Sequence, residues 1–193
     1  MLNTVLGSLS SGVAAATGSF ESIATFTAAG GETSTTFSSI SSSYKHLQLR
    51  VLYRDTYSGG AQTCDLLLQF NGDTTAANYT LHYLRGDGSA VAASGSTSNG
   101  SIQMTYFGVS DSSTASVYGT GIADIIDYAN TSKNKTVKGF GGGDNNGVGT
   151  TSYRLGLSSG VWLSTSAITS IKVMPGITAF KAGTSIALYG IKG

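Results

Sequence analysis

The side chains that could support catalysis or bind a metal ion are few in this sequence, and they are widely spaced. Two histidines, His46 and His82, one cysteine, Cys64, and ten acidic residues make up the whole set. A zinc site needs several such ligands that converge, and no spacing here indicates one. A thiol nucleophile needs a basic partner. Cys64 shares one face of an expected strand with Leu66, Leu68 and Phe70, so we expect a buried structural thiol instead.

Two groups of acidic residues come closest to a functional pattern. Asp124 lies near Asp127, and Asp144 precedes the asparagine pair 145–146, so either group could offer oxygen ligands to calcium. The two isoleucines between Asp124 and Asp127 indicate core, and we expect all these polar groups in loops or at strand ends. Glycosidase chemistry needs two carboxylates on facing strands, about 5 to 10 Å apart. Most acidic residues here stand beside Gly, Ser or Asn at expected turns, so we predict no enzyme and no catalytic, cofactor or metal site.

Three short motifs are explained better by structure than by function. Residues 139–143 read GFGGG, but neither a Lys-Ser ending nor a strand-to-helix context accompanies them, so they do not predict a phosphate-binding loop. Residues 85–87 spell Arg-Gly-Asp, which integrins recognise, and the following Gly88 favours a hairpin turn. A chain rich in Ser and Thr forms glycosylation sequons by chance, and these begin at Asn78, Asn99, Asn130 and Asn134.

Aromatic residues are stronger candidates for a functional site than these motifs, because exposed aromatic rings on strands can stack on sugars and also suit protein interfaces. Several of them alternate with Leu or Val, which favours a place in the core or in a subunit interface. The residues concerned are Tyr53, Tyr79, Tyr83, Tyr106, Tyr118, Tyr128, Tyr153, Trp162 and Tyr189.

The composition indicates many short strands and turns. Only 11% of the 193 residues are charged, against about 25% in ordinary globular proteins, and Ser, Thr, Gly and Asn, which disfavour helix interiors, take their place. The net charge of +1 gives no electrostatic reason to expect nucleic acid as a partner. No apolar run approaches the length of a membrane span, so we expect no membrane partner.

Alternating apolar residues predict about ten strands from residue 20 onward. The clearest is 45–54, with Leu47, Leu49, Val51 and Tyr53 on one face. Asn-Gly-Asp at 71–73 predicts a turn. The other strands are expected at 22–27, 34–37, 64–70, 79–83, 101–107, 116–128, 136–140, 153–157, 167–174 and 184–191.

The glycine-dense stretches 89–100 and 139–149 are predicted to be loops. Residues 1–18 contain no charged residue and are punctuated by glycines, so we expect an extended N-terminal arm, followed by one domain at 19–193. The spacing of strands and turns predicts an all-β, antiparallel β-sandwich.

Four stretches together resemble a group of small structural proteins of tailed bacteriophages. They are 18–25 (GSFESIAT), 44–50 (YKHLQLR) with 70–73 (FNGD), 123–131 (ADIIDYANT) and 184–193 (TSIALYGIKG). The resemblance covers most of the chain from Gly18 onward. It implies a component of the virion with a β-sandwich of jelly-roll type, placed on the head or the tail.

We therefore expect a capsid decoration (cement) protein that clamps neighbouring subunits of the major capsid protein, with the arm at 1–18 as its anchor. A homotrimer is expected from the local three-fold axes of a shell. The alternative is a receptor-binding, glycan-binding module of a tail or head fibre that would use the loops 89–100 and 139–151, and another tail component is a third possibility.

Overall fold

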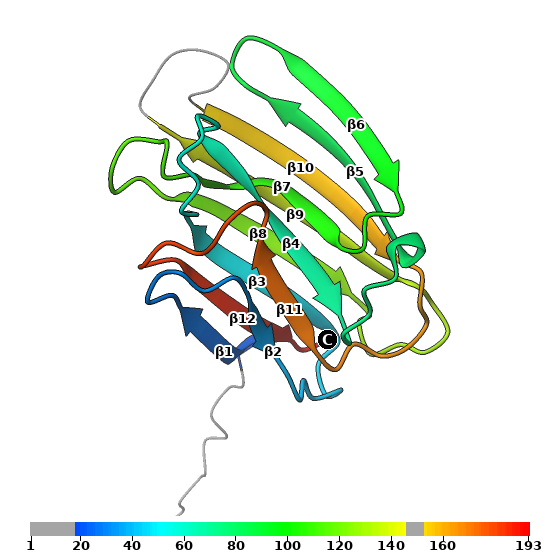
Figure 1. The fold of residues 1–193 in the computed structure, drawn as a ribbon. Coiled ribbons are helices and arrows are strands. Elements are labelled where there is room, and N and C mark those ends of the chain that lie inside the picture. The colour runs from blue at the N-terminus through cyan, green and yellow to red at the C-terminus, as the bar shows by residue number, and fades with distance from the viewer. Residues whose placement is uncertain (1–17, 146–152) are drawn as a thin grey trace, which may run out of the picture.

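The computed structural model describes residues 18–145 and 153–193, and almost all of their regular structure is strand (Figure 1). The predicted arm falls on residues that lie outside this description, apart from Gly18, so the arm stays a prediction. The elements are β1 Phe20–Thr27, β2 Thr35–Phe37, β3 His46–Tyr53, β4 Thr63–Phe70, the 3-10 helix η1 Ala76–Asn78, β5 Tyr79–Gly86, β6 Val91–Thr97, β7 Ile102–Val109, β8 Gly119–Ile126, β9 Lys135–Asp144, β10 Tyr153–Trp162, β11 Ile171–Pro175 and β12 Ser185–Ile191.

The strands form two stacked antiparallel sheets, which confirms the all-β sandwich. The large sheet has the order β1-β12-β3-β8-β9-β10-β5-β6, and the small sheet has the order β2-β11-β4-β7. The first four strands of the large sheet and the four of the small sheet have the strand order of a jelly roll, in which the first and last strands pair. This agrees with the expected jelly-roll type.

Four strands are added to that eight-stranded framework. The hairpin of β5 and β6 is inserted between β4 and β7, and the hairpin of β9 and β10 is inserted between β8 and β11. The β9–β10 hairpin joins the large sheet beside β8, and the β5–β6 hairpin joins beside β10, so that the sheet has eight strands. The extension lies at the upper right of Figure 1, where β6 is the outermost strand.

The core lies between the two sheets and is built by the alternation that the sequence shows. On β3, Leu47, Leu49, Val51 and Tyr53 are buried, and the residues that alternate with them face out. The large sheet meets β4 and β11 through further buried side chains, among them Phe70, which packs against Trp162 with ring centroids 5.7 Å apart. Burial of these apolar residues supplies the main stabilising free energy.

The predicted loop at 139–149 is wrong for residues 139–144, which belong to β9. The inward-facing glycines Gly121, Gly139 and Gly141 form a floor on which the ring of Phe107 lies, because any Cβ at these positions would overlap that ring. A Cβ at Gly119 would similarly stand 2.6 Å from the backbone of Gly108. Glycines are therefore required here because β7 approaches β8 and β9 too closely for side chains.

The predicted loop at 89–100 is also largely wrong, because residues 91–97 form β6. This strand pairs with β5 in an unbroken antiparallel register, from Gly86 opposite Val91 to Thr80 opposite Thr97. Small residues and a lack of alternation hid the strand in the sequence.

The predicted turns are confirmed. Asn71 and Gly72 both have positive φ (52° and 70°), the conformation that Asn and Gly tolerate best. At the β5–β6 hairpin, Asp87 accepts hydrogen bonds from the backbone N–H groups of Ser89 and Ala90 (3.1 and 2.8 Å), and Gly88 has φ of 81°. The Asp of the Arg-Gly-Asp motif thus stabilises a turn.

Candidate protein interface on the outer sheet face

The outer face of the large sheet carries apolar side chains that packing of the core does not explain. The inner face packs on the small sheet, whereas no described residue covers the outer face over β8, β9, β10 and β5. An outward-facing strand surface in water normally carries polar side chains. On this extension, however, many outward-facing positions are apolar.

Cross-strand register places five of these apolar residues in one row, which we call the apolar ladder: Ala93, Leu84, Leu157, Phe140 and Ile122. Ala93 stands opposite Leu84, Leu84 opposite Leu157, Leu157 opposite Phe140, and Phe140 opposite Ile122. The four larger side chains are 45–53% exposed. Directly opposed side chains on one sheet face lie about 5 Å apart, so the ladder is one continuous apolar strip across five strands.

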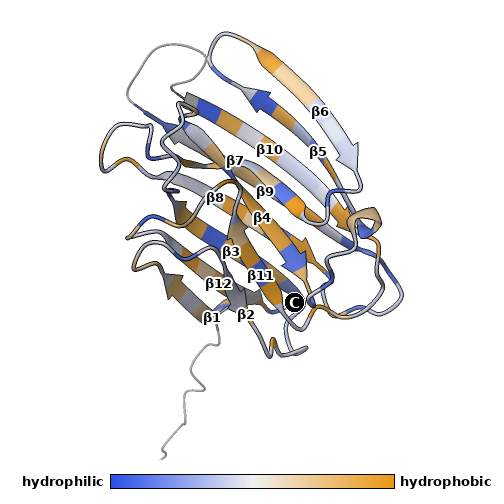
Figure 2. Cartoon of the chain, in the orientation of Figure 1, coloured by the Kyte–Doolittle hydropathy of each residue, from blue (hydrophilic) through white to orange (hydrophobic). Residues whose placement is uncertain are grey.

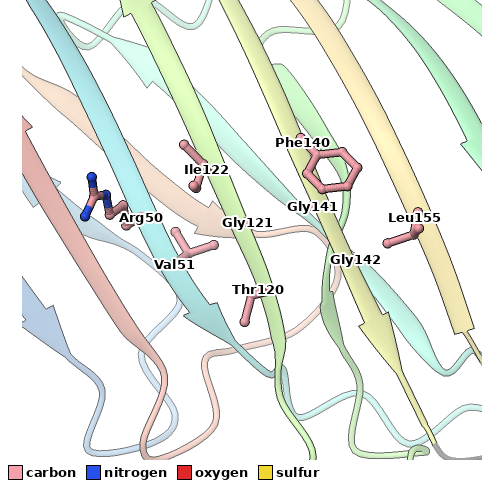
Figure 3. A pocket seen from close by; sticks show the side chains of 9 residues that line it. All are labelled: Arg50, Val51, Thr120, Gly121, Ile122, Phe140, Gly141, Gly142 and Leu155. Carbon is pink, nitrogen blue, oxygen red and sulfur yellow. The ribbon is translucent and has the colours of Figure 1, made fainter.

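A second row beside the ladder widens the apolar surface and makes it uneven. Leu155 is 58% exposed, and it leans over Gly142, where an added Cβ would come within 2.5 Å of its Cδ2. Figure 3 shows the shallow cavity that results, with Phe140 and Leu155 on one side and Ile122 on the other. Its volume is about 330 Å³. A surface with such projections and hollows can interlock with a partner.

Polar side chains border this apolar surface on the β3 and β12 side. The guanidinium of Arg50 lies between two rings, 5.1 Å from the centroid of Phe20 and 4.8 Å from that of Tyr189. It also donates a hydrogen bond to Gln48 (2.7 Å), which in turn donates to Asp124 (2.7 Å). An apolar centre with a hydrogen-bonded polar rim is the usual anatomy of a protein interface.

The two histidines and the cysteine, which were candidates for chemistry, lie on three different strands. Cys64 is buried and donates a hydrogen bond to the carbonyl oxygen of Val109 (3.2 Å), which confirms the expected structural thiol. Burial raises the pKa of this thiol well above its ordinary value. His82 is exposed on β5, whereas His46 lies at the start of β3 and accepts a hydrogen bond from the backbone of Asp127.

The two acidic groups considered for calcium have other partners. Asp127 forms ion pairs with Lys45 (3.2 Å) and Lys133 (3.1 Å), which keep its pKa below the ordinary value. The side chain of Asn145 bonds to the backbone of Thr114 and to Gln62, and residue 146 lies outside the description. Within residues 18–145 and 153–193, no group of three or more His, Cys, Asp or Glu side chains is placed to hold a metal ion.

The aromatic residues divide between the core and the surface. Four of them, Tyr53, Tyr79, Tyr128 and Trp162, are buried, as expected for core residues. The others whose side chains are described are partly exposed: Tyr83 and Tyr106 contact each other with centroids 6.5 Å apart, Tyr118 donates to the carbonyl oxygen of Ala182, and Tyr189 contacts Arg50.

Sequence reasoning did not find the apolar ladder. Its members belong to five strands that are scattered between residues 84 and 157, and only the strand order brings them together. One signal was present: in β10, Leu155 and Leu157 alternate with Gly156 and Ser158. That alternation predicts a strand but not which of its faces points outward.

Comparisons with known proteins leave the family open. No known protein family matches the chain, and no curated protein matches its sequence. The resemblance to structural proteins of tailed bacteriophages therefore stays a prediction.

A separate observation concerns membranes. In the part of the chain that the structure describes, no helix has the length and apolar character needed to cross a bilayer.

Proposed function

We propose that this chain is a non-enzymatic structural protein of a bacteriophage particle, a capsid decoration (cement) protein that binds shell subunits through the outer face of its large sheet. The observation that supports this proposal best is the apolar ladder on that face. A contiguous row of exposed apolar side chains with a polar border is one mark of a surface that contacts another protein. The ladder lies almost entirely on strands added to the jelly-roll framework, so it is not needed to complete that framework.

The strength expected of such a contact suits a protein present in many copies. Completing the burial of a half-exposed Leu, Ile or Phe gains roughly 1 kcal/mol, so the four larger side chains of the ladder together contribute about 4 kcal/mol. Association costs about 4 kcal/mol or more before any net affinity appears. A single face therefore binds weakly, and a second attachment, such as the predicted arm at 1–18, would raise the affinity through effective concentration.

A sheet is also a suitable carrier for this contact, because it is already ordered before binding. The ladder is held by continuous pairing from β6 to β8, so little conformational entropy is lost on docking. The jelly roll itself is shared by capsid proteins, lectins and enzymes, and it gives no further support to this function.

The glycan-binding alternative relied on loops at 89–100 and 139–151. Residues 91–97 and 139–144 form strands instead. Among the described residues, no observation favours that alternative over a protein contact.

The first test is the number of copies of the chain in purified particles, measured by quantitative mass spectrometry against the major shell protein. Decoration requires an abundance comparable with that of the shell protein. A few copies per particle would place the chain in the tail or a fibre, and complete absence from particles would refute a virion role.

A binding experiment then tests the face itself, with particles that lack this protein. Leu157→Glu and Phe140→Glu introduce charge into the ladder and should abolish binding to such particles, while the variants keep the circular dichroism spectrum of the parent. Thr36→Glu, at an exposed position of β2 on the small sheet, is the matched control and should bind normally. Deletion of residues 1–18 measures the separate contribution of the predicted arm. Normal binding of both ladder variants would refute the proposed face.

A further inference from the structure

The large sheet ends on one side in a strand with an open backbone edge. Strand β6 pairs with β5 along its whole length, and within the described ranges no strand pairs with its other side. Backbone N–H and C=O groups along such an edge can accept another strand. Natural proteins block edges with bulges, charges, proline or a very short strand, so the presence or absence of these features is informative.

The other three sheet edges are blocked in one of these ways. Strand β1 has a register shift between Ser22 and Ala24, and Glu21 on it forms an ion pair with Lys192 (2.8 Å). Strand β2 has only three residues. Strand β7 is irregular opposite residues 64–66. None of these edges offers a long regular strand.

Strand β6 has none of these protections. Its seven residues, VAASGST, include no charged residue and no proline, and its register shows no bulge. In Figure 2 it is orange at its start and pale along the rest of its length, without the saturated blue seen on neighbouring β5. All but one of its residues are exposed, and the side chains are small, so a second strand can approach without steric hindrance.

We propose that β6 pairs in antiparallel fashion with β6 of a second copy of this chain, across a two-fold axis perpendicular to the sheet. An antiparallel pair of identical strands is self-complementary, as a two-fold contact requires. The register with Ser94 opposite its own copy pairs all seven residues, and it places Val91 opposite Thr97. Two large sheets then become one continuous sheet.

Charge and polarity both favour a second copy as the partner. Because β6 carries no charge, self-pairing brings no like charges together on the strand. The same register places residues 89–90, at the end of the hairpin turn, opposite the uncharged residues 98–99 of the other copy. The apolar ladder ends on β6 at Ala93, so the outer faces of both copies join into one apolar surface across the axis.

This contact is inferred from the strand edge alone and does not depend on the proposed function. Side chains this small offer less than the roughly 800 Å² per partner that is typical of stable interfaces, so the dimer should be weak and dependent on concentration. The two-fold contact also competes with the expected homotrimer, and a mass measurement separates the two.

The test is light scattering coupled to size-exclusion chromatography, over concentrations that reach the millimolar range. The unmodified protein should shift from the mass of one copy to that of two. Ser94→Lys and Ser94→Glu should each stay monomeric, and an equal mixture of them should regain the dimer, which a merely unfolded variant could not do. Thr25→Lys, at an exposed position on the opposite edge strand β1, is the control and should dimerise normally. A mass of one or three copies at all concentrations, or a dimer that Ser94→Lys leaves intact, would overturn the proposal.

Discussion

A methyl group added at Gly141 probes the contact between the glycine floor and Phe107. The close approach of Phe107 accounts for the glycines at inward positions of strand β9, where the sequence reads GFGGG. An ideal Cβ at Gly141 would overlap the Cδ1 atom of the Phe107 ring. The ring is fully buried between the sheets, so it cannot turn away into solvent, and β7 or β9 must shift to accommodate Gly141→Ala.

Two opposing effects set the expected magnitude. Extra volume in a well-packed core costs about 1–3 kcal/mol. Replacing Gly by Ala within a strand regains about 0.5–1 kcal/mol of backbone entropy. The net loss in the free energy of unfolding for Gly141→Ala should be about 1–2 kcal/mol. For a chain of this length, each kcal/mol lowers the melting temperature by about 2–4 °C.

Thermal unfolding followed by circular dichroism measures this loss, and Gly86→Ala provides the matched control. Gly86 lies in β5 of the same sheet, and a Cβ there would meet no atom within 4 Å. Its substitution should leave the melting temperature unchanged or raise it slightly. If Gly141→Ala and Gly86→Ala unfolded at the same temperature, β7 would not lie on the glycine floor as described.

A double-mutant cycle with Phe107→Leu links the loss to this one contact. The smaller side chain makes room for the new methyl group, so Gly141→Ala should cost less in the Phe107→Leu background. A coupling of at least about 0.5 kcal/mol is expected for residues in direct contact. Additive losses would show that Gly141→Ala acts elsewhere.

Three further predictions concern single side chains. Asp73 accepts a hydrogen bond from the indole N–H of Trp162 (2.7 Å), which lowers the pKa of its carboxyl in the folded state. The resulting stability is present above about pH 4 and is lost as the pH falls toward the folded pKa. Asp73→Asn should therefore lower the melting temperature at pH 7 and lower it progressively less at acid pH. Cys64 should react with thiol reagents only after unfolding, since it is buried with a raised pKa, and fast reaction of the native protein would contradict this. Arg54 is buried and bonds to several acceptors within 111–117, so Arg54→Met should cost about 2 kcal/mol or more and speed amide exchange in that segment.

Strands with one polar and one apolar face were predictable from the sequence, because burial in a two-layer sandwich imposes a period of two. The strand at β3 follows this rule along its whole length, from Leu47 to Tyr53. The tight turn at 71–72 was predictable as well, since few residues other than Asn and Gly adopt positive φ easily. These features depend on local chemistry, which a single sequence records directly.

Strand β6 and the second half of β9, residues 141–144, were not predictable in the same way, although the sequence did predict a strand at 136–140. The residues of these two stretches carry little information about burial. In β9, inward-facing positions such as Gly139 and Gly141 are occupied by glycine for steric reasons that originate on β7. Glycine usually marks turns, so its local meaning and its tertiary meaning conflict here. In β6, most residues are exposed, and no apolar face appears.

The same steric cause links the fold to the candidate interface. Where β7 lies against β9 and β10, the inner face has little room for side chains, so Gly141 and Gly156 occupy inward positions while Phe140 and Leu157 face outward. Crowding inside explains why the inner residues are small, but it does not explain why the outer residues are apolar. Polar residues would serve the sheet equally well on a face that met only water. An apolar outer row that the core does not require is the reason why the proposed protein contact is placed on this face.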